Sequence, residues 1–149
     1  MAYILEKYPD KTHLSNARVT KMIYLADWRH AITDKKQITN IRWYFDNYGP
    51  YVWDIKEVAE ANPDLFTTIE GSTAYGNPKL LLEIIDNKYI PNLSEEEKKT
   101  LDHVIAKTKD LSWSEFIRLI YSTYPIITSE RYSYLDLCEK AKDYLRTSE

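Results

Sequence analysis

The fold is decided by the stretch VTKMIYLADWRHAI, residues 19–32. Ser15 is placed to cap a helix that runs from Asn16 to about Ile32. On this helix one apolar stripe is formed by Val19, Met22, Ile23, Ala26 and His30, and it is widened by Tyr24, Leu25, Trp28 and Ile32. A helix that is apolar over so broad an arc packs against neighbours on most sides. We therefore predict that it forms the centre of the fold.

The segments on either side of this helix predict shorter elements. A helical pattern over residues 2–8 is interrupted by Pro9. Apolar and polar side chains alternate over residues 41–45, which indicates a strand, and the residues 47–50 then turn the chain. Pro50 is tolerated as the first residue of a helix, so we expect a helix over residues 50–61 that ends before Asn62-Pro63.

The second half of the chain predicts a hairpin followed by helices. Two short strands are expected at 65–70 and 79–85, and the linker 71–78 holds two of the three glycines, which indicates a loose hairpin. Capping-box patterns begin at Ser94 and Ser112, so helices are expected at about 94–108 and 113–121, with a last one at about 133–146. These elements predict one α+β domain over residues 1–149, predominantly helical, with about six helices and a small antiparallel sheet or hairpin.

The composition is typical of a folded, soluble protein. Of the 149 residues, 44% are apolar or aromatic, enough for one domain to bury roughly 68–70% of the unfolded chain's surface. The net charge of −3 gives no reason to expect nucleic acid or an anionic membrane as a partner. The single cysteine permits no internal disulfide, and the first residues lack the pattern of a signal peptide. We therefore expect a cytoplasmic protein.

Side chains that carry enzyme chemistry are scarce in the sequence. The three histidines are widely separated, and no Cys-x-x-Cys, His-Glu-x-x-His or calcium-loop pattern is present. Three glycines are too few for a phosphate-binding loop or a dinucleotide fingerprint. Asp27 and His30 lie one helical turn apart, and we interpret them as a structural hydrogen bond, not as a general base. We predict no catalytic residues, no metal site and no cofactor.

Tyrosine is unusually frequent in this chain. There are 13 tyrosines and 4 tryptophans against 3 phenylalanines. Rings with a polar tip suit both the edge of a core and the centre of an interface, so both interpretations stay open. Within the aromatic segment 43–53 the partner-binding hypotheses are Tyr44, Tyr48, Tyr51 and Trp53. Tyr44 and Trp53 are the stronger candidates for contact, because they lie outside the predicted apolar stripes. Roles in the fold are assigned to Tyr24, Trp28, Trp43, Gly49 and Pro50.

A winged-helix regulator that binds DNA is an alternative hypothesis. The helices before residue 62 and the hairpin at 65–85 have the order that such a domain needs. Its lysines and arginines are scattered, however, and Lys35-Lys36 is the nearest approach to a basic patch on that half. Contacts with phosphates usually dominate DNA affinity, so the charge pattern disfavours nucleic acid as a partner.

Four motifs together resemble the Panacea domain of SocA-like antitoxins. They are K-x-x-Y-L-A-x-W at 21–28, Y-G-P-x-V at 48–52, L-S-x-E-E at 93–97 and D-L-S at 110–112. The resemblance covers residues 3–125, most of the chain. The family commonly has a histidine before a Ser-x-x-Pro-Trp segment, whereas Tyr121 precedes Ser122-Thr123-Tyr124-Pro125-Ile126 here.

The resemblance implies a bacterial or phage antitoxin of a toxin–antitoxin system. Such a protein neutralises a toxin encoded nearby by direct binding and needs no catalysis of its own. The resemblance also leaves open an adaptor role, in which the chain delivers the toxin to an ATP-dependent protease. The expected partners are thus a cognate protein toxin and, in the adaptor case, a protease, with no membrane.

Overall fold

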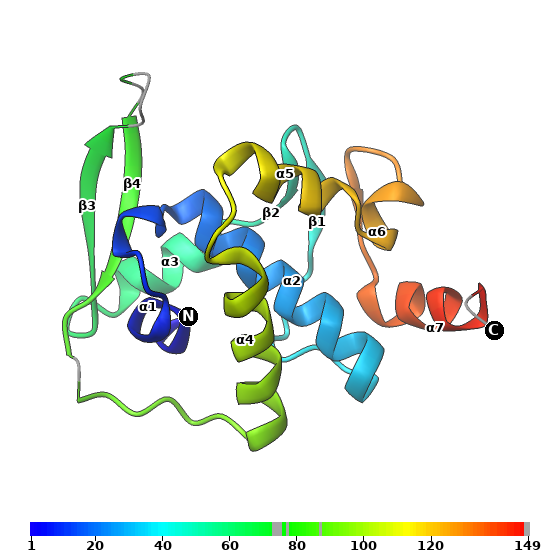
Figure 1. The fold of residues 1–149 in the computed structure, drawn as a ribbon, viewed down its shortest axis with the longest axis horizontal. Helices are drawn as coiled ribbons and strands as arrows, with labels where there is room; N and C mark the ends of the chain where they lie inside the picture. The colour runs from blue at the N-terminus through cyan, green and yellow to red at the C-terminus, as the bar shows by residue number, and fades with distance from the viewer. Residues whose placement is uncertain (73–75, 77, 87, 148–149) are drawn as a thin grey trace.

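A computed structural model gives the fold (Figure 1) and describes residues 1–72, 76, 78–86 and 88–147. The helices of this part are α1 (Ala2–Lys7), α2 (Asn16–Asp34), α3 (Asp54–Ala61), α4 (Glu95–Thr108), α5 (Trp113–Tyr121), α6 (Tyr124–Ile127) and α7 (Leu137–Thr147), with a 3-10 turn η1 (Lys11–His13). The strands are β1 (Tyr44–Asp46), β2 (Gly49–Tyr51), β3 (Phe66–Ser72), β4 (Pro78–Ile84) and β5 (Ser133–Tyr134). The predicted class, α+β and predominantly helical, is confirmed.

Helix α2 runs through the middle of the molecule, with α4 across it and α7 beside its C-terminal half (Figure 1). The side chain of Ser15 accepts a hydrogen bond from the backbone N–H of Arg18 at 3.1 Å and so caps the first turn. The helix ends at Asp34, and the backbone of the following Lys35 is left-handed with φ 65°. Thirteen of its 19 residues are buried. The predicted central helix is confirmed and extends two residues beyond Ile32.

Both predicted capping boxes form. The backbone N–H of Glu97 donates to Ser94 Oγ at 3.1 Å, and the N–H of Ser94 donates to the Glu97 carboxylate at 2.8 Å. Ser112 and Glu115 repeat the exchange at 3.2 and 3.1 Å. These bonds satisfy backbone donors that have no partner within a helix, so α4 and α5 begin where the sequence places them.

The segment around Pro50 corrects the prediction. Residues 49–51 form β2, which pairs antiparallel with β1, and the helix predicted over 50–61 begins only at Asp54. Pro50 lacks an N–H, but β2 is an edge strand in the order β2-β1-β5, where a missing donor is tolerated. Gly49 has φ +102°, a backbone region that favours glycine. Strand β1 covers 44–46 instead of the predicted 41–45.

The predicted hairpin forms from β3 and β4. Phe66 lies opposite Ile84, and Ser72 lies opposite Pro78. The linker expected at 71–78 is shorter, because Gly71, Ser72 and Pro78 belong to the strands; its residues 73–75 and 77 lie outside the described part. The N–H of Leu82 donates to the carbonyl of Leu14 at 2.9 Å, which ties the hairpin to the segment before α2.

The C-terminal helix begins later than predicted. Residues 133 and 134 form β5, and α7 covers Leu137–Thr147 instead of 133–146. The N–H of Tyr132 donates to the carbonyl of Phe45, and the N–H of Leu135 donates to the carbonyl of Trp43 at 2.9 Å. Because Phe45 of β1 and the preceding Trp43 accept these hydrogen bonds, residues 133 and 134 between the two donors are held extended. The short helix α6, which the sequence did not predict, precedes this segment.

A buried polar cluster joins α2 to the strand region. The Asp27 carboxylate accepts hydrogen bonds from Trp43 Nε1 at 2.8 Å and from the backbone N–H of Thr39 at 3.0 Å. The predicted bond between Asp27 and His30 is wrong, because His30 Nδ1 is hydrogen-bonded to Thr100 Oγ1 at 2.9 Å. Burial raises the pKa of Asp27, and the surrounding donors oppose that shift.

Candidate functional site

Three tyrosines share one face of the sheet β2-β1-β5. Tyr44 lies opposite Tyr51 on one side and opposite Tyr134 on the other, and facing residues of paired strands project to the same side. The Tyr44 and Tyr134 rings pack edge to face with centroids 5.0 Å apart. Trp53 extends the row, since its ring lies 5.4 Å from that of Tyr51. We call Tyr134, Tyr44, Tyr51 and Trp53 the aromatic strip.

The aromatic strip is amphipathic and partly open to solvent. Trp53 is 62% exposed and Tyr134 is 55% exposed, whereas Tyr44 and Tyr51 are half-buried. The hydroxyl groups of Tyr44 and Tyr134 and the indole N–H of Trp53 form no hydrogen bond with any described residue. The Tyr51 hydroxyl accepts one from Asn16 Nδ2 at 3.1 Å. Three polar tips of the strip are therefore available to a partner.

A positive charge marks one end of the strip. The guanidinium carbon of Arg42 lies 3.6 Å from the centroid of the Tyr134 ring, a close cation–π contact. Arg42 is exposed and, within the described part of the chain, its side chain forms neither an ion pair nor a hydrogen bond. Its planar donors can therefore meet a carboxylate or a carbonyl of a partner.

The structure divides the four predicted partner-binding residues. Tyr44, Tyr51 and Trp53 belong to the aromatic strip, whereas Tyr48 lies at the β1–β2 turn, 80% exposed, without a ring contact to the strip. Sequence reasoning missed Tyr134 and Arg42 as members of this surface. Tyr134 joins through a two-residue strand 90 positions beyond Tyr44. The alternation of exposed Tyr134 with buried Leu135 is its only local signal.

The inner face of the same sheet packs into the core. Phe45 and Pro50 are buried opposite each other on this face. Gly49 lies so close to α2 and α5 that an added Cβ would sit 3.6 Å from Ile120 and 3.8 Å from the Lys21 side chain. The sheet therefore rests directly on two helices and presents the strip from a firmly packed base.

Other residues assigned to the fold lie beneath this base. Trp43 is fully buried, and its ring lies 5.6 Å from the ring of Tyr24, whose hydroxyl is hydrogen-bonded to Thr123 Oγ1 at 2.9 Å. Trp28 is also buried and stacks on Tyr124 with centroids 6.4 Å apart. The indole N–H of Trp43 and the hydroxyl of Tyr24 are therefore both hydrogen-bonded inside the molecule.

Lys21 is a buried cation next to the strip. Lys21 is 2% exposed, and its Nζ atom lies 5.7 Å from the centroid of the Tyr51 ring. Burial lowers the pKa of Lys21 to about 8, while the charge of Asp46 opposes the shift. Lys21 thus remains mainly protonated at neutral pH and places positive charge next to Tyr51.

The described residues contain no cluster of three or more His, Cys, Asp or Glu side chains that could hold a metal ion. In this same part of the chain, every helix is too short or too polar to cross a membrane.

The comparison with protein families identifies the chain. The sequence model of the family described as antitoxin SocA-like, Panacea domain, matches residues 19–125. This match covers more than half of the chain, so the chain belongs to that family. It begins later than the resemblance over 3–125 and includes Arg42, Tyr44, Tyr51 and Trp53, but not Tyr134. No curated protein and no solved structure matches the chain.

Proposed function

We propose that this chain is an antitoxin that neutralises a cognate protein toxin by binding it directly, with the aromatic strip as the contact surface. Membership of the antitoxin family supports the role. The observation that carries the choice of surface is the row of four rings with three unused polar tips. The chain neutralises the toxin by sequestering it in the cytoplasm, without catalysis.

The physical chemistry of the strip suits recognition of a protein. Tyrosine, tryptophan and arginine supply large contact area and directed polar groups, and they dominate the affinity of many interfaces. Few rotamers are lost on binding, because Tyr44 and Tyr51 are already half-buried on the sheet. A standard interface buries about 800 Å² on each partner. Four adjacent rings and Arg42 can form the centre of such an interface.

The proposal is tested by co-expression with the product of the adjacent reading frame. We expect the chain to suppress the toxicity of that product and to co-purify with it at equal subunit ratio. Complete rescue without detectable association, in a strain that retains its proteases, would contradict direct binding and favour an enzymatic role.

The lifetime of the toxin distinguishes sequestration from delivery to a protease. A sequestered toxin stays bound and stable in pulse-chase experiments. Rapid loss of the toxin only when both the antitoxin and an ATP-dependent protease are present would assign the adaptor role instead.

A further inference from the structure

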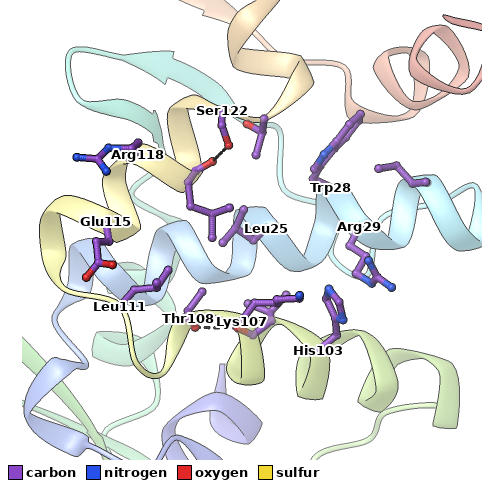
Figure 2. A pocket seen from close by; sticks show the side chains of 14 residues that line it. Leu25, Trp28, Arg29, His103, Lys107, Thr108, Leu111, Glu115, Arg118 and Ser122 are labelled. Atoms are coloured by element: carbon purple, nitrogen blue, oxygen red, sulfur yellow. Dashed lines mark hydrogen bonds between the residues drawn. The ribbon is translucent and has the colours of Figure 1, made fainter. Parts of the chain in front are cut away.

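A groove of about 740 Å³ lies among α2, α4 and α5 and shares no residue with the aromatic strip (Figure 2). Its apolar lining comes mainly from Leu25, Trp28, Ile32, Val104 and Leu119. Pockets of this size accommodate several side chains of a ligand or a peptide. The groove is therefore large enough to receive one face of a helix.

Basic side chains surround the groove. Figure 2 shows Arg29, His103 and Lys107 gathered at one end, with Arg118 and Glu115 at the other. Glu115 is the only acidic residue of the lining, and its carboxylate already accepts the hydrogen bond of the α5 capping box. The groove thus has a positive edge on a chain whose net charge is −3.

The two strongly basic side chains at the His103 end of the groove have no acidic partner in the described part of the chain. The side chains of Arg29 and Lys107 form no ion pair or hydrogen bond with any described residue, whereas Arg118, at the other end, interacts electrostatically with Glu115. Other helical lysines do pair with a carboxylate one turn away, as Lys98 does with Glu95 and Lys142 with Glu139. Burial lowers the pKa of His103, and the charges of Arg29 and Lys107 lower it further. The positive charge is therefore concentrated at this end of the groove.

We infer that the groove binds an acidic amphipathic helix of the toxin. Its apolar side chains would lie over Leu25 and Trp28, and its carboxylates would meet Arg29 and Lys107. An apolar groove with a charged edge is a known mode of helix recognition, and complementary charge selects the partner. This inference rests on the proposed function and adds a second contact with the same toxin.

Two synthetic peptides test the groove without the toxin. Both carry Leu and Phe on one helical face, and their flanking residues are Glu in one and Lys in the other. We expect the intact chain to bind the Glu peptide about tenfold or more tightly than the Lys peptide, as measured by fluorescence anisotropy. The double variant Arg29→Glu, Lys107→Glu should reverse this order.

Two control variants distinguish peptide binding in the groove from a general effect of the chain's charge. The variant Lys36→Glu, Lys88→Glu makes the same change of charge at exposed positions that do not line the groove, and it should bind both peptides as the parent does. Ser122→Trp places a large ring in the groove from an exposed position and should abolish binding of the Glu peptide. Circular dichroism on each variant verifies that the chain is folded.

Equal binding of both peptides, or binding that the groove variants leave unchanged, would overturn the inference. So would the absence of any binding. Self-association that Arg29→Glu, Lys107→Glu abolishes, seen by sedimentation, would assign the groove to a second copy instead. Suppression of toxicity is measured on the same variants: if peptide binding fails while the parent chain still neutralises the toxin, only the groove assignment is wrong.

Discussion

Trp43 and Tyr44 are neighbours in the chain, yet they belong to regions with opposite chemistry. Trp43 is fully buried and donates its indole N–H to Asp27, and the hydroxyl of its ring neighbour Tyr24 is hydrogen-bonded to Thr123. Tyr44 projects to the outer face with Tyr134, and their hydroxyls have no partner among the described residues. At these two neighbouring positions, burial and hydrogen bonding of the polar tip distinguish a ring of the core from a ring of the outer face.

The largest effect is expected from removing Trp43. Trp43→Ala should lower the free energy of unfolding by about 3–5 kcal/mol, because it leaves a cavity and removes a donor from buried Asp27. Urea unfolding followed by circular dichroism measures this loss. Trp53→Ala is the control and should change the stability by less than about 1 kcal/mol, since Trp53 is 62% exposed. Equal losses of stability in the two variants would contradict the distinction between the core around Trp43 and the exposed face around Trp53.

The next effect is on binding of the toxin. Trp53→Ala should weaken the complex by about 2 kcal/mol or more, as expected for a central aromatic anchor. Calorimetry of the purified complex measures the change in Kd. Trp113→Ala is the matched control, because Trp113 is 48% exposed on α5 outside the strip and should leave Kd unchanged. A Trp113 variant that weakens binding as much as the Trp53 variant would move the contact surface elsewhere.

A third prediction concerns the buried cation at the boundary of the two regions. The pKa of Lys21 is about 8 in the folded chain, below its ordinary value of 10.5. Between these values the unfolded chain holds a proton that the folded chain has released, so the free energy of unfolding rises with pH. Lys21 should contribute about 2 kcal/mol of this rise between pH 8 and 10.

The comparison with Lys21→Met isolates that contribution. Urea unfolding at several pH values should give the variant a flatter profile than the parent chain over this range. Parallel profiles would mean that Lys21 keeps its ordinary pKa and is not desolvated beside Tyr51.

The smallest effects distinguish single hydroxyl groups. Tyr24→Phe should lower the stability by about 1 kcal/mol, because it removes a buried hydrogen bond to Thr123. Tyr134→Phe should leave the melting temperature unchanged and weaken toxin binding by about 1 kcal/mol. Thermal melts should therefore detect only the Tyr24→Phe change, and Kd measurements should detect the Tyr134→Phe change. A lower melting temperature for Tyr134→Phe would place its hydroxyl in the fold.

Much of the helical framework could be predicted because its signals are local. Ser15, Ser94 and Ser112 mark helix starts that satisfy backbone donors within one turn, and the stripe on α2 directly specifies a buried helix. Tyr44, Tyr51 and Trp53 could be proposed as contact residues because they lie within 10 positions of one another.

The remaining features depend on contacts between distant segments. Pro50 has the same local signal at the start of a helix and in an edge strand, and only its pairing with Phe45 decides between them. Residues 133 and 134 are extended because this segment pairs with residues 43–45, which no local pattern reveals. The inclusion of Tyr134 in the strip, and the choice of Trp43 over His30 as the partner of Asp27, follow from the same long-range pairing.

Hydroxyl-radical footprinting of the free chain and of its complex with the toxin tests the central claim most directly. It reports the solvent access of individual side chains without the need for a substitution. We expect oxidation of Trp53 and Tyr134 to fall several-fold in the complex, while oxidation of Trp113 stays constant. Unchanged oxidation of Trp53 and Tyr134 in a stable complex would contradict the assignment of the aromatic strip as the contact surface.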